Sequence, residues 1–358
     1  MAENTFESGR RLDFSLSEAT GAVGDSITVL PVAVAVAALT DLELPVLLLG
    51  FAVFQVVWGL RYGVPVSVEP MKALAALVVA DTLTTGEFVT AGLLAGGVLL
   101  VLGATGSLGR LAAHVGDPVV RGVQVAVALL LARTGLELGV AAPTTALLAA
   151  AVTAVVAALG YRRVSALAVL ALGLVLAGFD VGVSPPSLPA VSIGFTPVLT
   201  SGMLSAAAGQ LAMTVGNAAV ATSLLLSDLL DADVSPDELA TSMGAMNLLA
   251  LPFGAMPMCH GSGGVAGKYA FGARTAGANL VLGVLYALAA VFAASLVAAF
   301  PLPVLGVVLV LVAVELGKSG LDTDHPWLAV GIGLLGLLTN VGVAFVVGVG
   351  ARRLRNKI

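Results

Sequence analysis

Apolar runs of about 20 residues, each long enough to cross the ~30 Å hydrocarbon core of a bilayer as a helix, follow one another along almost the whole chain of 358 residues. Only 10% of the residues are charged, whereas soluble domains carry about 25%. The sequence therefore predicts an all-α polytopic membrane protein without a sizeable soluble domain.

The breaks between the runs predict about 14 transmembrane segments, seven in each half of the chain. We expect a cytoplasmic tail over residues 1–18, a first seven-span repeat over 19–179, an inter-repeat loop over 180–197, a second repeat over 198–350 and a basic cytoplasmic tail over 351–358. An odd number of spans per half makes the halves antiparallel, which gives an inverted repeat.

Basic residues predict the orientation of these spans. With both termini in the cytoplasm, Arg61, Arg110, Arg274 and Lys318 fall on the cytoplasmic side together with the basic C-terminal tail, and Arg133 is the exception. The first residues contain no apolar core of a cleavable signal peptide. We therefore expect a multi-pass protein of the cell membrane with cytoplasmic N- and C-termini.

Two proline-containing stretches share one pattern. Pro65 and Pro70 have the spacing of Pro252 and Pro257, and a methionine, Met71 or Met258, follows the second proline of each pair. Proline has no N–H to donate and a φ that suits a first helical turn, while the residue before it favours extended backbone. Each stretch therefore predicts an extended segment followed by a helix start at the second proline.

Within the membrane, such stretches become broken helices 3 and 10, whose free N–H groups and positive dipole ends face a shared cavity suited to an anion. Glu69 and Lys72 lie in the first stretch. Intramembrane charges cost about 2.5 to 3.5 kcal/mol each and mark transport pathways; a mutual structural ion pair is the alternative. Lys268 lies farther along its helix, where we expect a lysine that reaches the cytoplasmic interface.

The second stretch adds Cys259, His260 and Gly261, whose backbone N–H groups could bind an oxyanion. His260 could also titrate and couple proton movement to transport, or remain neutral and hydrogen-bond to a neighbouring helix. We expect no metal and no cofactor, because Cys259 is the single cysteine and the other histidines, His114 and His325, lie in predicted loops.

Further polar residues lie inside two other spans. Gln210, Thr214 and Asn217 are spaced by four and three residues and share one helical face, and Asp25 and Thr28 occupy the first span of the other half. We expect both faces to line the same cavity, with interhelical hydrogen bonding as the alternative.

Four segments resemble the molybdate transporter family related to the sulfate permeases: 18–25, 64–72, 209–217 and 253–274. The resemblance implies the seven-plus-seven inverted repeat shared with sulfate and uracil permeases, divided into core and gate domains, with an oxyanion between the starts of half-helices 3 and 10. It also implies a member without the C-terminal regulatory domain of sulfate permeases. Glu69 and Lys268 stand where relatives often have Gln.

The leading hypothesis is a secondary transporter of a tetrahedral dianion, molybdate or sulfate, coupled to a proton or cation. Glu69 and His260 are the coupling candidates, and we expect Glu69 to be protonated with substrate bound, because desolvation disfavours its charged form. The partners are the lipid bilayer and a possible second copy in a homodimer; nucleic acid is not expected for a net charge of -5. An anion channel, a nucleobase permease and a membrane-embedded enzyme using Cys259 and His260 are the alternatives.

Overall fold

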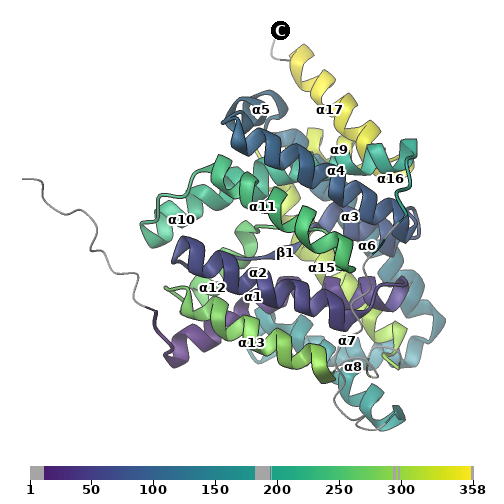
Figure 1. Cartoon of the computed structure of the whole chain (residues 1–358). Coiled ribbons are helices and arrows are strands. Elements are labelled where there is room, and N and C mark those ends of the chain that lie inside the picture. The colour runs from purple at the N-terminus through teal and green to yellow at the C-terminus, as the bar shows by residue number, and fades with distance from the viewer. Residues whose placement is uncertain (1–11, 182–193, 195, 293–295, 297–298, 356–358) are drawn as a thin grey trace, which may run out of the picture.

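The computed structural model describes residues 12–181, 194, 196–292, 296 and 299–355, which form a bundle of helices (Figure 1). The first half contains α1 (Leu16–Leu39), α2 (Leu44–Tyr62), β1 (Glu69–Pro70), α3 (Lys72–Val79), α4 (Thr85–Ala104), α5 (Leu108–Val115), α6 (Asp117–Ala141), α7 (Pro143–Ala158), η1 (Arg162–Val164) and α8 (Ser165–Val181).

The second half contains α9 (Ser201–Met213), η2 (Thr214–Ala221), α10 (Thr222–Leu230), α11 (Pro236–Ala250), η3 (Leu251–Phe253), β2 (Met258–Cys259), α12 (Ser262–Ala270), α13 (Gly277–Phe292), α15 (Leu302–Leu321), α16 (Pro326–Leu338) and α17 (Val341–Arg355). Here η2 is a π-helix that joins α9 to α10 into one long helix.

Seven helical segments of the described residues are long and apolar enough to cross a membrane, and three shorter helices are also apolar. This confirms the prediction of a multi-pass, all-α membrane protein. The number of 14 spans and the boundaries of the two repeats stay predictions.

The two proline-containing stretches meet at the centre of the fold. β1 and β2 pair antiparallel, with Glu69 opposite Cys259 and Pro70 opposite Met258, and the N–H of Met71 donates to the carbonyl of Pro257 at 2.8 Å. Figure 1 shows β1 in the interior of the bundle. The short helices α3 and α12 begin directly after these strands, so the predicted pair of broken helices with adjacent starts is present.

Pro70 and Pro257, the second prolines of the two stretches, do not lie at equivalent distances from the helix starts that follow them. Lys72 and Ser262, the first residues of α3 and α12, are 190 positions apart, whereas Pro70 and Pro257 are 187 apart. A helix start at Pro257 was therefore the wrong prediction. Hydrogen bonds from Asn247 of α11 hold the backbone after Pro257 extended: its amide donates to the carbonyl of Met258 at 2.6 Å and accepts the N–H of Met258 at 2.8 Å.

Helices of the two halves pack against each other: α2 against α13, α4 against α11, α1 against α12 and α6 against α15. Glycines let these backbones approach, as small residues do in membrane helix pairs. A Cβ on Gly135 of α6 would meet the carbonyl oxygen of Gly306 of α15, and a Cβ on Gly306 would meet that of Gly135. The halves are therefore interlocked around the β1–β2 pair. The division into core and gate domains stays a prediction.

Several boundaries differ from the predicted spans. α1 already begins at Leu16, α17 continues to Arg355 through residues expected in the basic tail, and α5 occupies residues for which no helix was predicted. α5 has only 8 residues, whereas a membrane-spanning helix needs about 20, so the lengths of the apolar runs do not predict it. Most of the predicted inter-repeat loop lies outside the described residues.

Candidate functional site

Glu69 connects the starts of the two half-helices. Its Oε2 forms an ion pair with the ammonium group of Lys72, the first residue of α3. Its Oε1 accepts the N–H of Gly264, in the first turn of α12, at 2.7 Å. The Glu69 side chain is 1% exposed and the Lys72 side chain is 16% exposed. Of this pair, Lys72 is therefore the member that is partly exposed.

Glycines at the start of α12 make room for the Glu69 carboxylate. A Cβ on Gly261 or on Gly264 would meet the carboxylate oxygens, whereas a Cβ on Gly263 would meet no other atom within 4 Å. Gly263 is also exposed. The start of α12 thus has one turn closed around Glu69 and one residue facing open space.

The predicted polar face of Gln210, Thr214 and Asn217 reaches both half-helix starts. The side-chain oxygen of Gln210 accepts the N–H groups of Ala73 at 3.0 Å and Leu74 at 3.2 Å in the first turn of α3, and its amide donates to Thr214 at 2.9 Å. Asn217, in the π-helix η2, accepts the hydroxyl hydrogen of Ser262, the first residue of α12, at 2.7 Å. π-helical turns are frequent at functional sites.

Asp25 lies close to this cluster but is fully buried. Its Oδ1 accepts the hydroxyl of Ser67 at 2.5 Å, and its Oδ2 accepts the amide of Gln55 at 2.7 Å and lies 3.1 Å from the ammonium of Lys268. Ser67 also lies 3.3 Å from Oε1 of Glu69. The Ser67 hydroxyl therefore lies between Asp25 and Glu69, while the other side-chain contacts of Asp25 are to the buried residues Gln55 and Lys268. Thr28, predicted on the same face, donates to the backbone carbonyl of Asp25.

Lys268 does not reach the membrane interface, so that prediction was wrong. The residue is 0% exposed, and besides Asp25 it contacts the Val66 carbonyl at 2.7 Å, Gln55 at 2.9 Å and Asn279 at 3.1 Å. Because α12 begins at Ser262 and not at Pro257, Lys268 lies only in its second turn, close to the half-helix starts. Polar groups of α1, α2 and α13 satisfy its charge there.

His260 has both ring nitrogens in hydrogen bonds. Nδ1 lies 2.8 Å from the carbonyl oxygen of Ser67, and Nε2 lies 2.7 Å from the hydroxyl of Ser242 in α11. The imidazole is 0% exposed and packs edge-on against Trp58 and Tyr62. This geometry is that of the second alternative above, a histidine bonded to a neighbouring helix, and its role in coupling stays a prediction.

The remaining predicted site residues, Cys259, Met71 and Met258, have buried side chains. Cys259 lies 3.6 Å through its sulfur from the carbonyl oxygen of Pro70, and the side chains of Met71 and Met258 are fully buried. They fill the space around the β1–β2 pair, where they hold the half-helix starts together. Contact of these three side chains with a substrate stays a prediction.

Several polar residues of this centre were not predicted: Gln55, Ser67, Ser242, Asn247, Ser262 and Asn279. Gln55 and Asn279 interrupt apolar runs, and the reasoning that found Gln210 would have found them too. Ser67, Ser242 and Ser262 have no such signal, because serine is common in membrane helices and in the segments between them.

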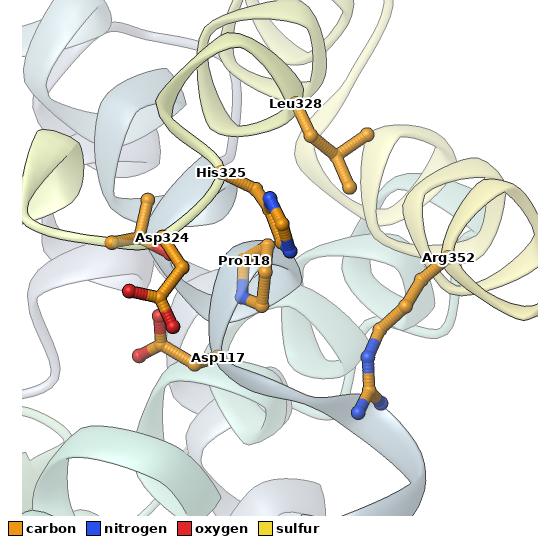
Figure 2. A pocket seen from close by; sticks show the side chains of 7 residues that line it. Asp117, Pro118, Asp324, His325, Leu328 and Arg352 are labelled. Atoms are coloured by element: carbon orange, nitrogen blue, oxygen red, sulfur yellow. The ribbon is translucent and has the colours of Figure 1, made fainter. Parts of the chain in front are cut away.

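A separate cavity of about 220 Å³ lies between the start of α6, the α15–α16 connection and α17. In Figure 2 the carboxylates of Asp117 and Asp324 lie on one side of this pocket and Arg352 on the other. None of the predicted site residues lines it. No group of three or more His, Cys, Asp or Glu among the residues that the structure describes could hold a metal ion.

A family model described as "Molybdate transporter of MFS superfamily" matches residues 17–131 and 202–316, one block in each half of the chain. Relatives include Molybdate transporter 2 of Arabidopsis thaliana, 31% identical over 369 residues, with 86% of this chain and 79% of that protein aligned. Molybdate transporter 1 of the same plant is 30% identical over 368 residues, with 86% and 80% aligned.

Solved structures show the same fold. The transmembrane domain of the cyanobacterium bicarbonate transporter BicA has a TM-score of 0.67 at 19% identity, covering 92% of this chain and 97% of that one. SLC26A9 has a TM-score of 0.73 at 15% identity, covering 95% of this chain and 64% of that one. Although the family description names the MFS superfamily, the fold is therefore that of the BicA and SLC26 transporters. The chain belongs to the molybdate transporter family and is a multi-pass membrane transporter, not an enzyme.

Proposed function

We propose that this chain is a secondary transporter that carries a tetrahedral oxyanion, molybdate or its close analogue sulfate, across the cell membrane by alternating access. Its family and its fold support transport of an anion. In the orientation predicted from the basic residues, with both termini in the cytoplasm, α12 runs from the centre towards the cytoplasm and α3 runs from the centre outwards.

The observation that carries this proposal is the position of Lys72 at the junction of the two half-helix starts, with part of its side chain exposed. A helix start is equivalent to about +0.5 charge. Two starts and one ammonium together would therefore balance a dianion. The side-chain NH2 of Asn217, whose oxygen accepts the Ser262 hydroxyl, and the N–H of Gly263 lie at the start of α12 and would donate to the oxygens of the substrate.

Proton coupling through Glu69 fits this charge count. An ionised Glu69 beside Lys72 cancels the ammonium charge, so a dianion would enter a site with too little positive charge. If a proton binds Glu69 together with the substrate, the balance is restored. His260 is the second candidate, but both of its ring nitrogens already have protein partners. Loss of the pH dependence of transport in Glu69→Gln would support this assignment, and unchanged pH dependence would contradict it.

Equilibrium binding to the purified protein in detergent tests the function directly, with molybdate, sulfate and uracil as separate ligands. We expect saturable molybdate binding that Lys72→Ala abolishes or weakens strongly. Lys318→Ala is the matched control, because Lys318 is half-exposed on α15 and pairs only with Glu315 among the described residues.

Three other outcomes would contradict parts of this proposal. Wild-type affinity in Lys72→Ala would remove Lys72 from the site, and binding of uracil without molybdate would support a nucleobase permease. Flux through proteoliposomes that neither saturates nor shows counterflow of labelled substrate would indicate a channel.

A further inference from the structure

We propose that the Glu69 carboxylate is a tethered competitor of the transported oxyanion: it occupies the contacts that the oxyanion needs, and the substrate binds only when Glu69 leaves them. This inference rests on the proposed function and adds a determinant of affinity within the same site. It concerns which group holds the contacts, and not whether Glu69 carries the coupled proton.

The contacts of Glu69 are those of a bound oxyanion. Its two oxygens contact the ammonium of Lys72 and the N–H of Gly264 at 2.7 Å, whereas the hydroxyl of Ser67, 3.3 Å from Oε1, lies closer to Asp25 at 2.5 Å. We call the Lys72 ammonium and the Gly264 N–H the carboxylate seat. A cation and a helix-start N–H are donors that proteins use for carboxylate and for inorganic oxyanions alike. An oxyanion that contacts Lys72 and the start of α12 therefore competes for the same hydrogens.

The carboxylate seat has room for an oxyanion group only because two residues lack a side chain. A Cβ on Gly261 would meet both oxygens of Glu69, and a Cβ on Gly264 would meet Oε1 of Glu69. Glu69 is almost completely buried in this position. The fit between the glycines and the carboxylate indicates that Glu69 occupies a shaped anion site rather than a general polar gap.

The backbone delivers the carboxylate at a high local concentration. Glu69 lies in β1, which pairs with β2 opposite Cys259, and the next N–H along the chain, that of Met71, bonds to Pro257. These bonds hold the Glu69 backbone beside the start of α12. A tethered group of this kind has an effective concentration in the millimolar range or above. The apparent affinity for a free ligand therefore falls in proportion to the fraction of molecules in which the carboxylate has left the seat.

The other charged and titratable side chains around Glu69 do not take the same contacts. Asp25 is the nearest carboxylate, but Lys268, Gln55 and Ser67 hold it. Asp25 therefore supplies a negative charge close to the carboxylate seat without filling it, which makes Asp25 a charge-matched control. The charged or titratable groups that interact with Glu69 are Lys72 from α3, Asp25 from α1, Lys268 from α12, Tyr286 from α13, and Cys259 and His260 from the second extended stretch.

Molybdate affinity in a series of variants at one position tests the inference. The Kd is measured at fixed pH and ionic strength for the wild type, Glu69→Asp, Glu69→Gln and Asp25→Asn, after thermal unfolding has shown that each variant is folded. We expect Glu69→Gln to bind at least about tenfold more tightly, because the amide keeps the shape but does not attract Lys72. Glu69→Asp keeps the charge on an arm that is too short for all the contacts, so its affinity should lie between the two. Asp25→Asn should stay within about twofold of the wild type.

Unchanged or weaker binding in Glu69→Gln would overturn the inference. So would a gain in Asp25→Asn as large as that in Glu69→Gln, because the effect would then be one of general charge. If Asp25→Asn does not fold, the comparison of Glu69→Asp with Glu69→Gln decides, since a general charge effect predicts that Asp behaves like Glu. Absence of molybdate and sulfate binding in all variants and the wild type would instead overturn the proposed function.

Discussion

The two half-helices each carry one lysine paired with one carboxylate, and the two pairs are built differently. Lys268 of α12 is fully buried, and Asp25, Gln55, Asn279 and the Val66 carbonyl surround it. Lys72 of α3 is partly exposed and pairs with Glu69. A buried ammonium with a full set of acceptors has little to gain from a ligand, whereas Lys72 can exchange its partner. The contrast indicates a structural role for Asp25 and Lys268, and it supports the proposal that Glu69 and Lys72 act at the substrate.

The largest effect that would test this contrast is on stability. Lys268→Met leaves Asp25 buried without its counter-charge, so the free energy of unfolding should fall by about 3–5 kcal/mol. Lys72→Met should cost less, about 1–3 kcal/mol, because the buried Glu69 loses its cation but keeps the N–H of Gly264, and the Lys72 side chain is 16% exposed. Thermal and denaturant unfolding in detergent micelles measure both. Equal losses in the two variants would show that the two pairs do not differ in the way that we infer.

A double variant checks the cause of that loss. In Lys268→Met combined with Asp25→Asn, no buried charge remains unpaired, so part of the lost stability should return. If the double variant is as unstable as the sum of the single ones, Lys268 stabilises the fold through its neutral partners, and the pairing with Asp25 is incidental.

Two neighbouring glycines give the next effect. A Cβ on Gly264 would meet Ser67, Asp25 and Glu69, whereas a Cβ on Gly263 would meet nothing within 4 Å. Gly264→Ala should therefore cost about 1–3 kcal/mol through overpacking, while Gly263→Ala should be neutral or stabilising by up to about 1 kcal/mol in a helix. Unfolding of the two variants under the same conditions measures the difference. Similar values would show that the start of α12 adapts easily and is not closely fitted around the carboxylates.

The sequence predicts which segments form the centre of this molecule better than it predicts the residue at which each central helix begins. Prolines show where a helix cannot continue, so Pro70 and Pro257 located the two breaks. The helix start after Pro257 lies later because Asn247, from a different helix, bonds to Met258, and a local pattern contains no information on such a tertiary contact. The same displacement moved Lys268 from an expected interfacial position to the buried pair with Asp25. The predicted polar face of Gln210, Thr214 and Asn217 did reach the half-helix starts.

The two starts also differ in the group that caps them, and Gln210→Glu would make them alike. The neutral oxygen of Gln210 accepts two N–H groups of α3, while the carboxylate of Glu69 accepts one of α12. A second carboxylate at the junction should weaken molybdate binding about tenfold, or about 1.4 kcal/mol, and should also lower stability, because Gln210 is 1% exposed and the helix start offsets only part of the cost of burying a charge there. Gln210→Met is the control, since it removes the cap without adding charge. Unchanged affinity in Gln210→Glu would place the substrate away from α3.

The smallest effect concerns Ser67, the hydroxyl between the two pairs. Its single hydrogen faces Asp25 at 2.5 Å and Glu69 at 3.3 Å, so the shorter contact should hold it. Ser67→Ala should then cost about 1 kcal/mol of stability and change molybdate affinity by less than about twofold, because the lost bond belongs to the structural pair. Ser26→Ala, which removes a buried hydroxyl 3.2 Å from Tyr286, is the matched control. A large change of affinity in Ser67→Ala alone would mean that Asp25 and Glu69 act through this hydroxyl as one unit, in which case the division between a structural pair and a substrate pair would be wrong.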